Sequence, residues 1–326
     1  MIDIPKLARS SATAGGAVWL ASLFFQTSDS YETEIIKRIF LLGILVIVPL
    51  GLSLVATPDR GGGHSTLYRL AVVTQPIGAV ASLISFVLSP GLTAALLAFS
   101  WLFVNSLIAF FGMWRFWRRG MCPAEETCVD AGLLYLPVGG MWFVMSRLGI
   151  QPFGFGDTIV LLTAVHFHFA GFAAPILAGM AGRLLNAQKR PPALFPLAVI
   201  SIIGGTPLVA AGITFSPALA LIGAFVISIG LTTLAGLVIG SLLRKVNPPT
   251  GRILLGISSL SSFSAMVLAR LYAYSIVAKK LIIDIPQMAM THGLLNAFGF
   301  VTCGLLAWSI IKPQTREGTS VPTSLN

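Results

Sequence analysis

The chain has 326 residues, of which 56% are hydrophobic and only 10% are charged, and its mean hydropathy is +0.89. A water-soluble globule of this size needs more polar side chains to cover its surface, so an integral membrane protein is predicted. The net charge of +10 at pH 7 comes from cations in short connections between apolar segments. Such cations encode membrane orientation and do not imply nucleic-acid binding.

Apolar segments of membrane-spanning length recur along the whole chain. A spanning helix needs about 20 mainly apolar residues, and Gly, Pro and charged residues separate ten such segments. We therefore predict an all-α, polytopic transmembrane bundle with spans near 11–27, 38–57, 68–88, 91–113, 130–148, 158–180, 194–213, 217–241, 252–275 and 287–311. The first span is the weakest, but no small-x-small cleavage site follows it, which favours a retained helix over a cleaved signal.

A single integral membrane domain over 1–326 is predicted, ending in a short polar tail over 313–326. The Lys and Arg residues set its orientation. With the N-terminus in the cytoplasm, the inner connections hold fifteen of the 21 cations and the outer connections hold five, and Arg270 is left inside a span. Because cytoplasmic connections carry an excess of Lys and Arg, both termini are predicted to lie inside.

The positions of the acidic residues and the cysteines argue against several kinds of active site. This division of the chain puts all eleven Asp and Glu residues in tails, connections or helix caps, so we expect no buried carboxylate. Proton relays through carboxylates and hydrolases built on paired acids or a Ser/His/Asp triad are therefore disfavoured. No phosphate-binding loop or dinucleotide fingerprint occurs. Cys122, Cys128 and Cys303 lack the spacing of a disulfide framework or a zinc site, so free thiols are expected.

Histidines supply the candidate site, because His166, His168 and His292 lie inside apolar spans, where polar groups are costly. The sixth and tenth spans run in the same direction. At 1.5 Å per residue, His166 and His168 lie roughly 14–17 Å and His292 roughly 9 Å from the outer end. Residues two apart on a regular helix point about 200° away from each other, so the first two diverge unless the helix is distorted. Pro175 offers such a distortion.

The last span carries four polar or small residues at i, i+4, i+7 and i+11: His292, Asn296, Gly299 and Cys303. This spacing places them on one helix face, which is predicted to look toward protein or a water-filled cavity. The face is interpreted either as a ligand site or as a set of hydrogen bonds between helices. Arg270, near the outer end of the ninth span, is expected either to reach the interface or to contact an anion.

Two segments carry a family resemblance: His166-Phe167-His168-Phe169-Ala170-Gly171-Phe172 and Thr291-His292-Gly293-Leu294-Leu295-Asn296-Ala297-Phe298-Gly299. They look like segments of the YndJ-like family of bacterial membrane proteins, and the resemblance is strongest from about 155 to 312. That family is functionally uncharacterised. The resemblance implies a multi-pass protein of the bacterial cytoplasmic membrane and gives weight to these residues without naming an activity.

The sequence leaves three functions open. The leading hypothesis is a transporter or small-ligand-binding protein, without a cofactor, whose polar site is lined by His166, His168, His292, Asn296, Arg270 and Cys303. The alternative is a membrane redox protein that binds haem or a transition metal through the three intramembrane histidines. Residues 291–295 are similar to a haem-ligating segment of haem-copper oxidases, although those enzymes need more histidines than the four present. The third is a structural subunit. The predicted partners are the lipid bilayer and an unidentified small molecule or ion, and no enzyme is favoured.

Overall fold

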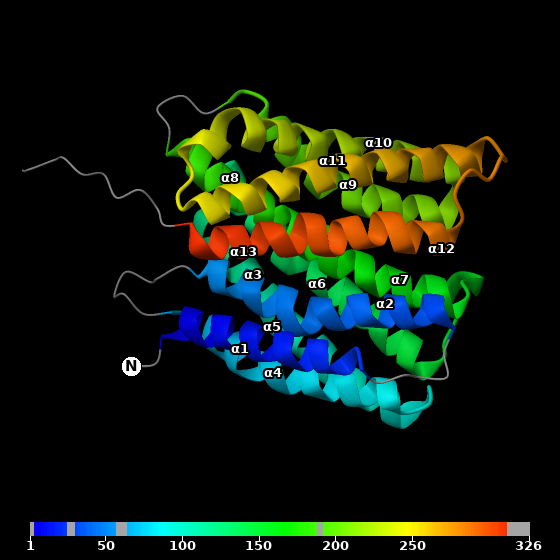
Figure 1. Cartoon of the computed structure of the whole chain (residues 1–326). Coiled ribbons are helices and arrows are strands. Elements are labelled where there is room, and N and C mark those ends of the chain that lie inside the picture. The colour runs from blue at the N-terminus through cyan, green and yellow to red at the C-terminus, as the bar shows by residue number, and fades with distance from the viewer. Residues whose placement is uncertain (1–2, 25–29, 57–63, 188–191, 312–326) are drawn as a thin grey trace, which may run out of the picture.

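The computed structural model describes residues 3–24, 30–56, 64–187 and 192–311, and all the regular elements in these ranges are helices. The helices run side by side along one axis (Figure 1). Nine of them, counted over the described residues, are long and apolar enough to cross a membrane. The predicted all-α, polytopic architecture is confirmed, while the predicted polar tail, 313–326, lies outside the described residues.

The elements follow in this order: α1 (Ile4–Ser22), α2 (Tyr31–Leu42), η1 (Gly43–Ile47), α3 (Val48–Val55), α4 (Thr66–Val87), α5 (Leu92–Arg119), α6 (Ala124–Leu148), η2 (Pro152–Gly154), α7 (Asp157–His166), η3 (Phe167–Ala173), α8 (Ala174–Asn186), α9 (Phe195–Phe215), α10 (Pro217–Leu237), η4 (Val238–Leu242), η5 (Leu243–Lys245), α11 (Pro249–Val277), α12 (Ile285–Met288), η6 (Ala289–Gly293), η7 (Leu295–Thr302) and α13 (Cys303–Ile310). Successive elements without an intervening connection form one continuous span, as α2, η1 and α3 do.

The first helix lies earlier in the chain than the sequence predicted. The carboxylate of Asp3 accepts a hydrogen bond from the backbone N–H of Lys6 at 3.0 Å, and Pro5 occupies the first turn, so α1 begins at Ile4. Both features are typical helix starts. The helix is not among the nine spans above, but it joins the bundle through a face of small residues, and the Ser11 hydroxyl donates to Gln75 at 2.7 Å.

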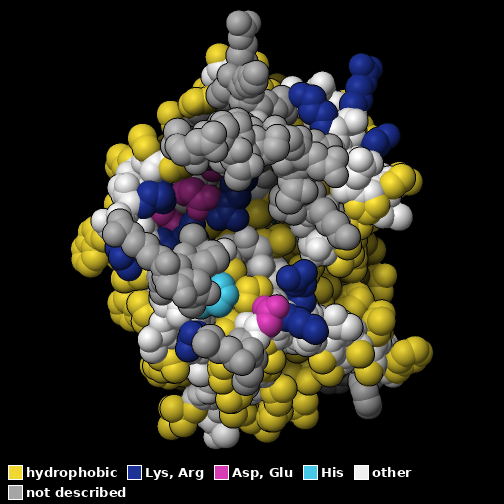
Figure 2. All heavy atoms as spheres, turned by 90° about the vertical axis from the view of Figure 1, so that its left-hand side faces the viewer, with side chains coloured by type: hydrophobic (Ala, Val, Ile, Leu, Met, Phe, Trp, Pro, Cys, Tyr) yellow, Lys and Arg dark blue, Asp and Glu magenta, His cyan; other side chains and the backbone are white. Residues whose placement is uncertain are grey.

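The start of α1 and the end of α13 lie at the same end of the bundle (Figure 1). Lys and Arg side chains gather there around a few acidic ones (Figure 2). We name this the basic end. The helices α7 and α12 both begin at the opposite end, as the sequence analysis expected for the sixth and tenth spans.

Five segments of the described chain are π-helical: η1, η3, η4, η6 and η7. Two of them end two residues before a proline, at Pro49 and Pro175. Proline lacks an N–H and its ring crowds the carbonyl four residues back, so the preceding turn widens. The distortion expected near Pro175 therefore takes the form of η3. Widened turns leave carbonyls for side chains of other helices, and Ile44 in η1 accepts from Gln75 at 2.8 Å.

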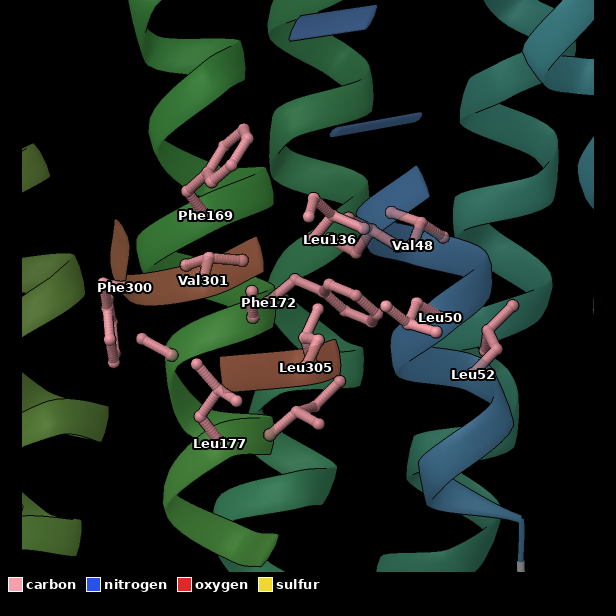
Figure 3. Close-up of a cluster of buried hydrophobic side chains, with 14 of the residues drawn as sticks. Val48, Leu50, Leu52, Leu136, Phe169, Phe172, Leu177, Phe300, Val301 and Leu305 are labelled. Carbon is pink, nitrogen blue, oxygen red and sulfur yellow. The ribbon is translucent and has the colours of Figure 1, made fainter. Parts of the chain in front are cut away.

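The apolar core lies where α3, α6, η3, α8, η7 and α13 meet (Figure 3). Phe172 of η3 is fully buried, and its ring lies so close to Gly51 of α3 that a Cβ at that glycine would be 2.9 Å from it. This core holds η3 and η7 against each other, and both carry residues of the candidate site.

Candidate functional site

His168 lies in the core, with no exposed surface. Its Nδ1 is 2.8 Å from the carbonyl oxygen of Ala164, and its Nε2 is 2.8 Å from the indole Nε1 of Trp101. The indole is a donor only, so Nε2 accepts and Nδ1 donates, which fixes a neutral imidazole in one tautomer. Gly139 makes room for the ring, because a Cβ there would lie 2.7 Å from Nδ1. Acting as a ligand would require His168 to release Trp101.

His166, the last residue of α7, faces away from the core and is exposed. Its Nδ1 is 2.7 Å from the carbonyl oxygen of Leu162, and its Nε2 has no hydrogen-bond partner among the described residues. The predicted divergence of His166 and His168 is confirmed. A donating Nδ1 leaves the lone pair of Nε2 available as an acceptor.

His292 of η6 is held from two sides. Its Nδ1 lies 2.9 Å from the carbonyl oxygen of Ala265 on α11, and its Nε2 lies 3.2 Å from the amide Nδ2 of Asn296. The same amide donates to the carbonyl oxygen of His292 at 2.9 Å. Because Asn296 donates through Nδ2, its Oδ1 is left as an acceptor. His166 is close enough to His292 to interact with it electrostatically.

Arg270 joins this group through α11. Its Nε donates to the carbonyl oxygen of Met266 at 3.2 Å, which is next in the chain to the carbonyl that binds His292. The side chain is half-buried, and no carboxylate lies within ion-pair distance of it in the described part of the chain. We name the group His166, His292, Asn296 and Arg270 the imidazole site.

Two predicted residues lie outside the imidazole site. His168 is enclosed in the core, and Cys303 lies farther along the last span and is half-buried. The stripe to which Cys303 belongs faces α11, since a Cβ at Gly299 would collide with the side chain of Ser261. Across the described ranges, no three His, Cys, Asp or Glu side chains are grouped as metal ligands would be.

The expectation that no carboxylate is buried is wrong. The predicted span began at residue 130, whereas α6 begins at Ala124 and takes three acids into the bundle. Asp130 is 1% exposed and Glu125 is 6% exposed, and the Glu126 side chain is 17% exposed. The argument against carboxylate chemistry that rested on this expectation therefore falls.

Two of these acids form a buried ion-pair network with three arginines: Arg115, Arg119, Arg183, Glu126 and Asp130. Arg115 lies 2.7 Å from Asp130 and 2.5 Å from Glu126, and Arg119 also pairs with Asp130. Arg183 binds Glu126 through two N–H groups, at 2.5 and 2.9 Å. The three cations and two anions join α5, α6 and α8 at the basic end. Arg115 itself is buried.

The network also satisfies the end of α3. The last carbonyls of a helix have no partner within the helix and must find one elsewhere. Arg115 donates to the carbonyl oxygen of Val55 at 2.9 Å, Arg183 donates to Leu54 at 3.0 Å, and the Tyr68 hydroxyl donates to Leu52 at 2.8 Å. Three carbonyls at the end of α3 therefore have side-chain donors as partners.

Sequence reasoning missed this network, although a signal for it exists. Arg115 and Arg119 are four residues apart on α5, and Glu126 and Asp130 are four residues apart on α6. Each pair lies on one helix face. A short connection makes the two helices antiparallel neighbours, so the cations and acids meet.

Comparison with known proteins identifies a matching family. Residues 38–300 match the sequence model described as YndJ-like protein. The chain is 27% identical over 304 residues to the uncharacterized membrane protein YndJ of Bacillus subtilis (strain 168), an alignment that covers 93% of this chain and 54% of the relative. The chain thus spans about half the length of that relative. No solved structure matches the chain. With four-fifths of its length matched by the family's sequence model, the chain belongs to the YndJ-like family.

Proposed function

We propose that this membrane protein binds a small polar solute with an acidic group at the imidazole site and carries it across the bilayer. The observation that supports this most is the meeting of the last span with α11. His292 and Arg270 bind adjacent carbonyls of α11, and Asn296 binds the imidazole of His292. The exposed His166 on α7 is within range of a through-space charge interaction with His292.

The free atoms of the imidazole site define the ligand class. Arg270 has one of its five N–H groups bonded to the backbone in the described structure, and guanidinium groups recognise carboxylates and phosphates. The Nε2 of His166 and the Oδ1 of Asn296 are acceptors. A solute with an anionic group toward Arg270 and a hydroxyl or amine toward the acceptors satisfies both kinds of atom.

The backbone around the imidazole site favours a functional interpretation. His292 lies within η6, Asn296 within η7, and η3 begins directly after His166. Such π-helical segments interrupt regular helices and occur frequently at functional sites. Polar side chains inside membrane spans are also rare, because inserting each one into the bilayer costs free energy, and those that are present often have a functional role.

The orientation gives the imidazole site its side of the membrane. His166 is ten residues into a span that begins opposite the basic end. If the basic end faces the cytoplasm, as the excess of Lys and Arg there favours, the imidazole site lies in the outer half of a bacterial cytoplasmic membrane. A solute would therefore reach it from outside.

Thermal stabilisation by candidate solutes tests the proposal. Purified protein would be heated with hydroxycarboxylates, polyols or alkylamines, and we expect a hydroxycarboxylate to raise the melting temperature. Ligand at 100 times its Kd stabilises by about 2.7 kcal/mol, and we expect this gain to be lost in His166→Ala and Arg270→Gln. The matched control is His64→Ala, because His64 precedes α4 at the basic end and should leave the gain intact.

If all four proteins respond equally, or if only amines or polyols stabilise the wild type, the proposed ligand class is wrong. If a solute does stabilise the wild type, its uptake into proteoliposomes distinguishes a transporter from a protein that only binds the solute. The redox alternative stays a prediction and has its own readout. A Soret band, or a stoichiometric transition metal, in native-source protein would favour it over solute binding.

A further inference from the structure

A small, partly open cavity lies between α8, α10, η4, α11, η7 and α13. Its volume is about 20 Å³. Its walls are mainly apolar, with Leu177, Leu231 and Phe300 among them, but α11 contributes three serines to it: Ser258, Ser259 and Ser262. The three are 5%, 4% and 1% exposed. The cavity therefore combines mainly apolar walls with hydroxyl groups on one side.

One of these hydroxyls has no partner. Ser258 donates to the carbonyl oxygen of Phe300 in η7 at 2.7 Å, whereas the Oγ of Ser262 is buried without a hydrogen bond. A buried polar group left unsatisfied is destabilising, and no bulk water reaches the interior of a membrane bundle to compensate it. The unpartnered hydroxyl lines the only polar wall of this cavity, which points to a bound molecule.

We propose that the cavity holds one ordered water molecule, bound by the hydroxyls of Ser262, Ser259 and Ser258. A site needs at least about 10–15 Å³ and two to four polar partners to hold a water. This cavity meets both requirements, and it is too small for an organic solute. The water accepts from or donates to Ser262, and Ser258 offers the remaining lone pairs of its Oγ. It lies about one helical turn along α11 from Ala265, the partner of His292, but does not depend on the proposed function.

If the water is present, the direction of the change in melting temperature on replacing Ser262 reveals it. Removing a hydroxyl that has no partner relieves a burial penalty, whereas removing one that binds water leaves the water with too few partners. We expect Ser262→Ala to lower the melting temperature of the detergent-purified protein. Ser228→Ala is the control, because the Ser228 Oγ is also buried without a partner, on α10, but does not line the cavity. We expect that variant to melt at or above the wild-type temperature.

A melting temperature for Ser262→Ala that equals or exceeds that of Ser228→Ala would overturn the proposal. An experimental density map of the wild-type protein is a second, independent test of the bound water. At a resolution where ordered waters are seen, a single peak within hydrogen-bond distance of the Ser262 Oγ is expected, and an empty cavity would contradict it.

Discussion

Replacing Arg115 with alanine is expected to destabilise the protein by about 3–5 kcal/mol, the cost of breaking a buried ion pair by removing one partner. The change leaves Glu126 and Asp130 with one arginine each in a buried setting and removes the donor to the carbonyl oxygen of Val55. The measurement is the free energy of unfolding in mixed micelles, for wild type and variant side by side.

Arg118 provides the matched control. It lies on the same helix, is exposed, and stacks over the ring of Trp114 at 5.0 Å. An exposed cation–π contact contributes about 0.5–1 kcal/mol, so Arg118→Ala is expected to have a small effect. Arg115→Ala combined with Asp130→Ala should cost less than the sum of the two single changes, since each removes the same contact. Equal costs for the Arg115 and Arg118 variants would show that the network is solvated.

The span positions followed from hydropathy, but the buried network did not. Counting apolar residues treats an acid as the end of a span, so it placed the start of the fifth span at residue 130 and left Glu126 outside. The acids enter because arginines from α5 and α8 meet them. These ion pairs join different helices, so the composition of one segment does not reveal them.

For the candidate site, too, the sequence predicted some features and missed others. Helix direction and rise predicted that His166 and His292 lie in the same half of the membrane, within one to two helical turns of each other. The period of a regular helix predicted that His166 and His168 point in different directions, without saying which of them lines the site. The stripe ending at Cys303 was extrapolated with the α-helical period, whereas η7 is a π-helix with a longer one. The partners of His292 and Arg270 are backbone carbonyls of α11, which no residue pattern marks.

The contact between α9 and α10 is a second place where a single substitution is expected to have a large effect on stability. Four glycines, Gly205 and Gly212 on α9 and Gly223 and Gly230 on α10, are spaced by seven residues on each helix and bring the two backbones together. A Cβ at Gly205 would lie 2.7 Å from the backbone nitrogen of Ile227. Small residues at such crossings replace the hydrophobic effect, which is absent between helices in lipid, by close packing.

Gly205→Ala is therefore expected to destabilise the protein by about 1–3 kcal/mol or more, because the added methyl group meets backbone that cannot rotate away. Gly204→Ala is its neighbouring control, since no atom lies within 4 Å of a Cβ there. That variant should gain up to about 1 kcal/mol from the higher helix propensity of alanine. Opposite signs at adjacent positions would locate the contact to one helix face. If both changes stabilised the protein, α9 and α10 would have to be farther apart than the glycine contacts require.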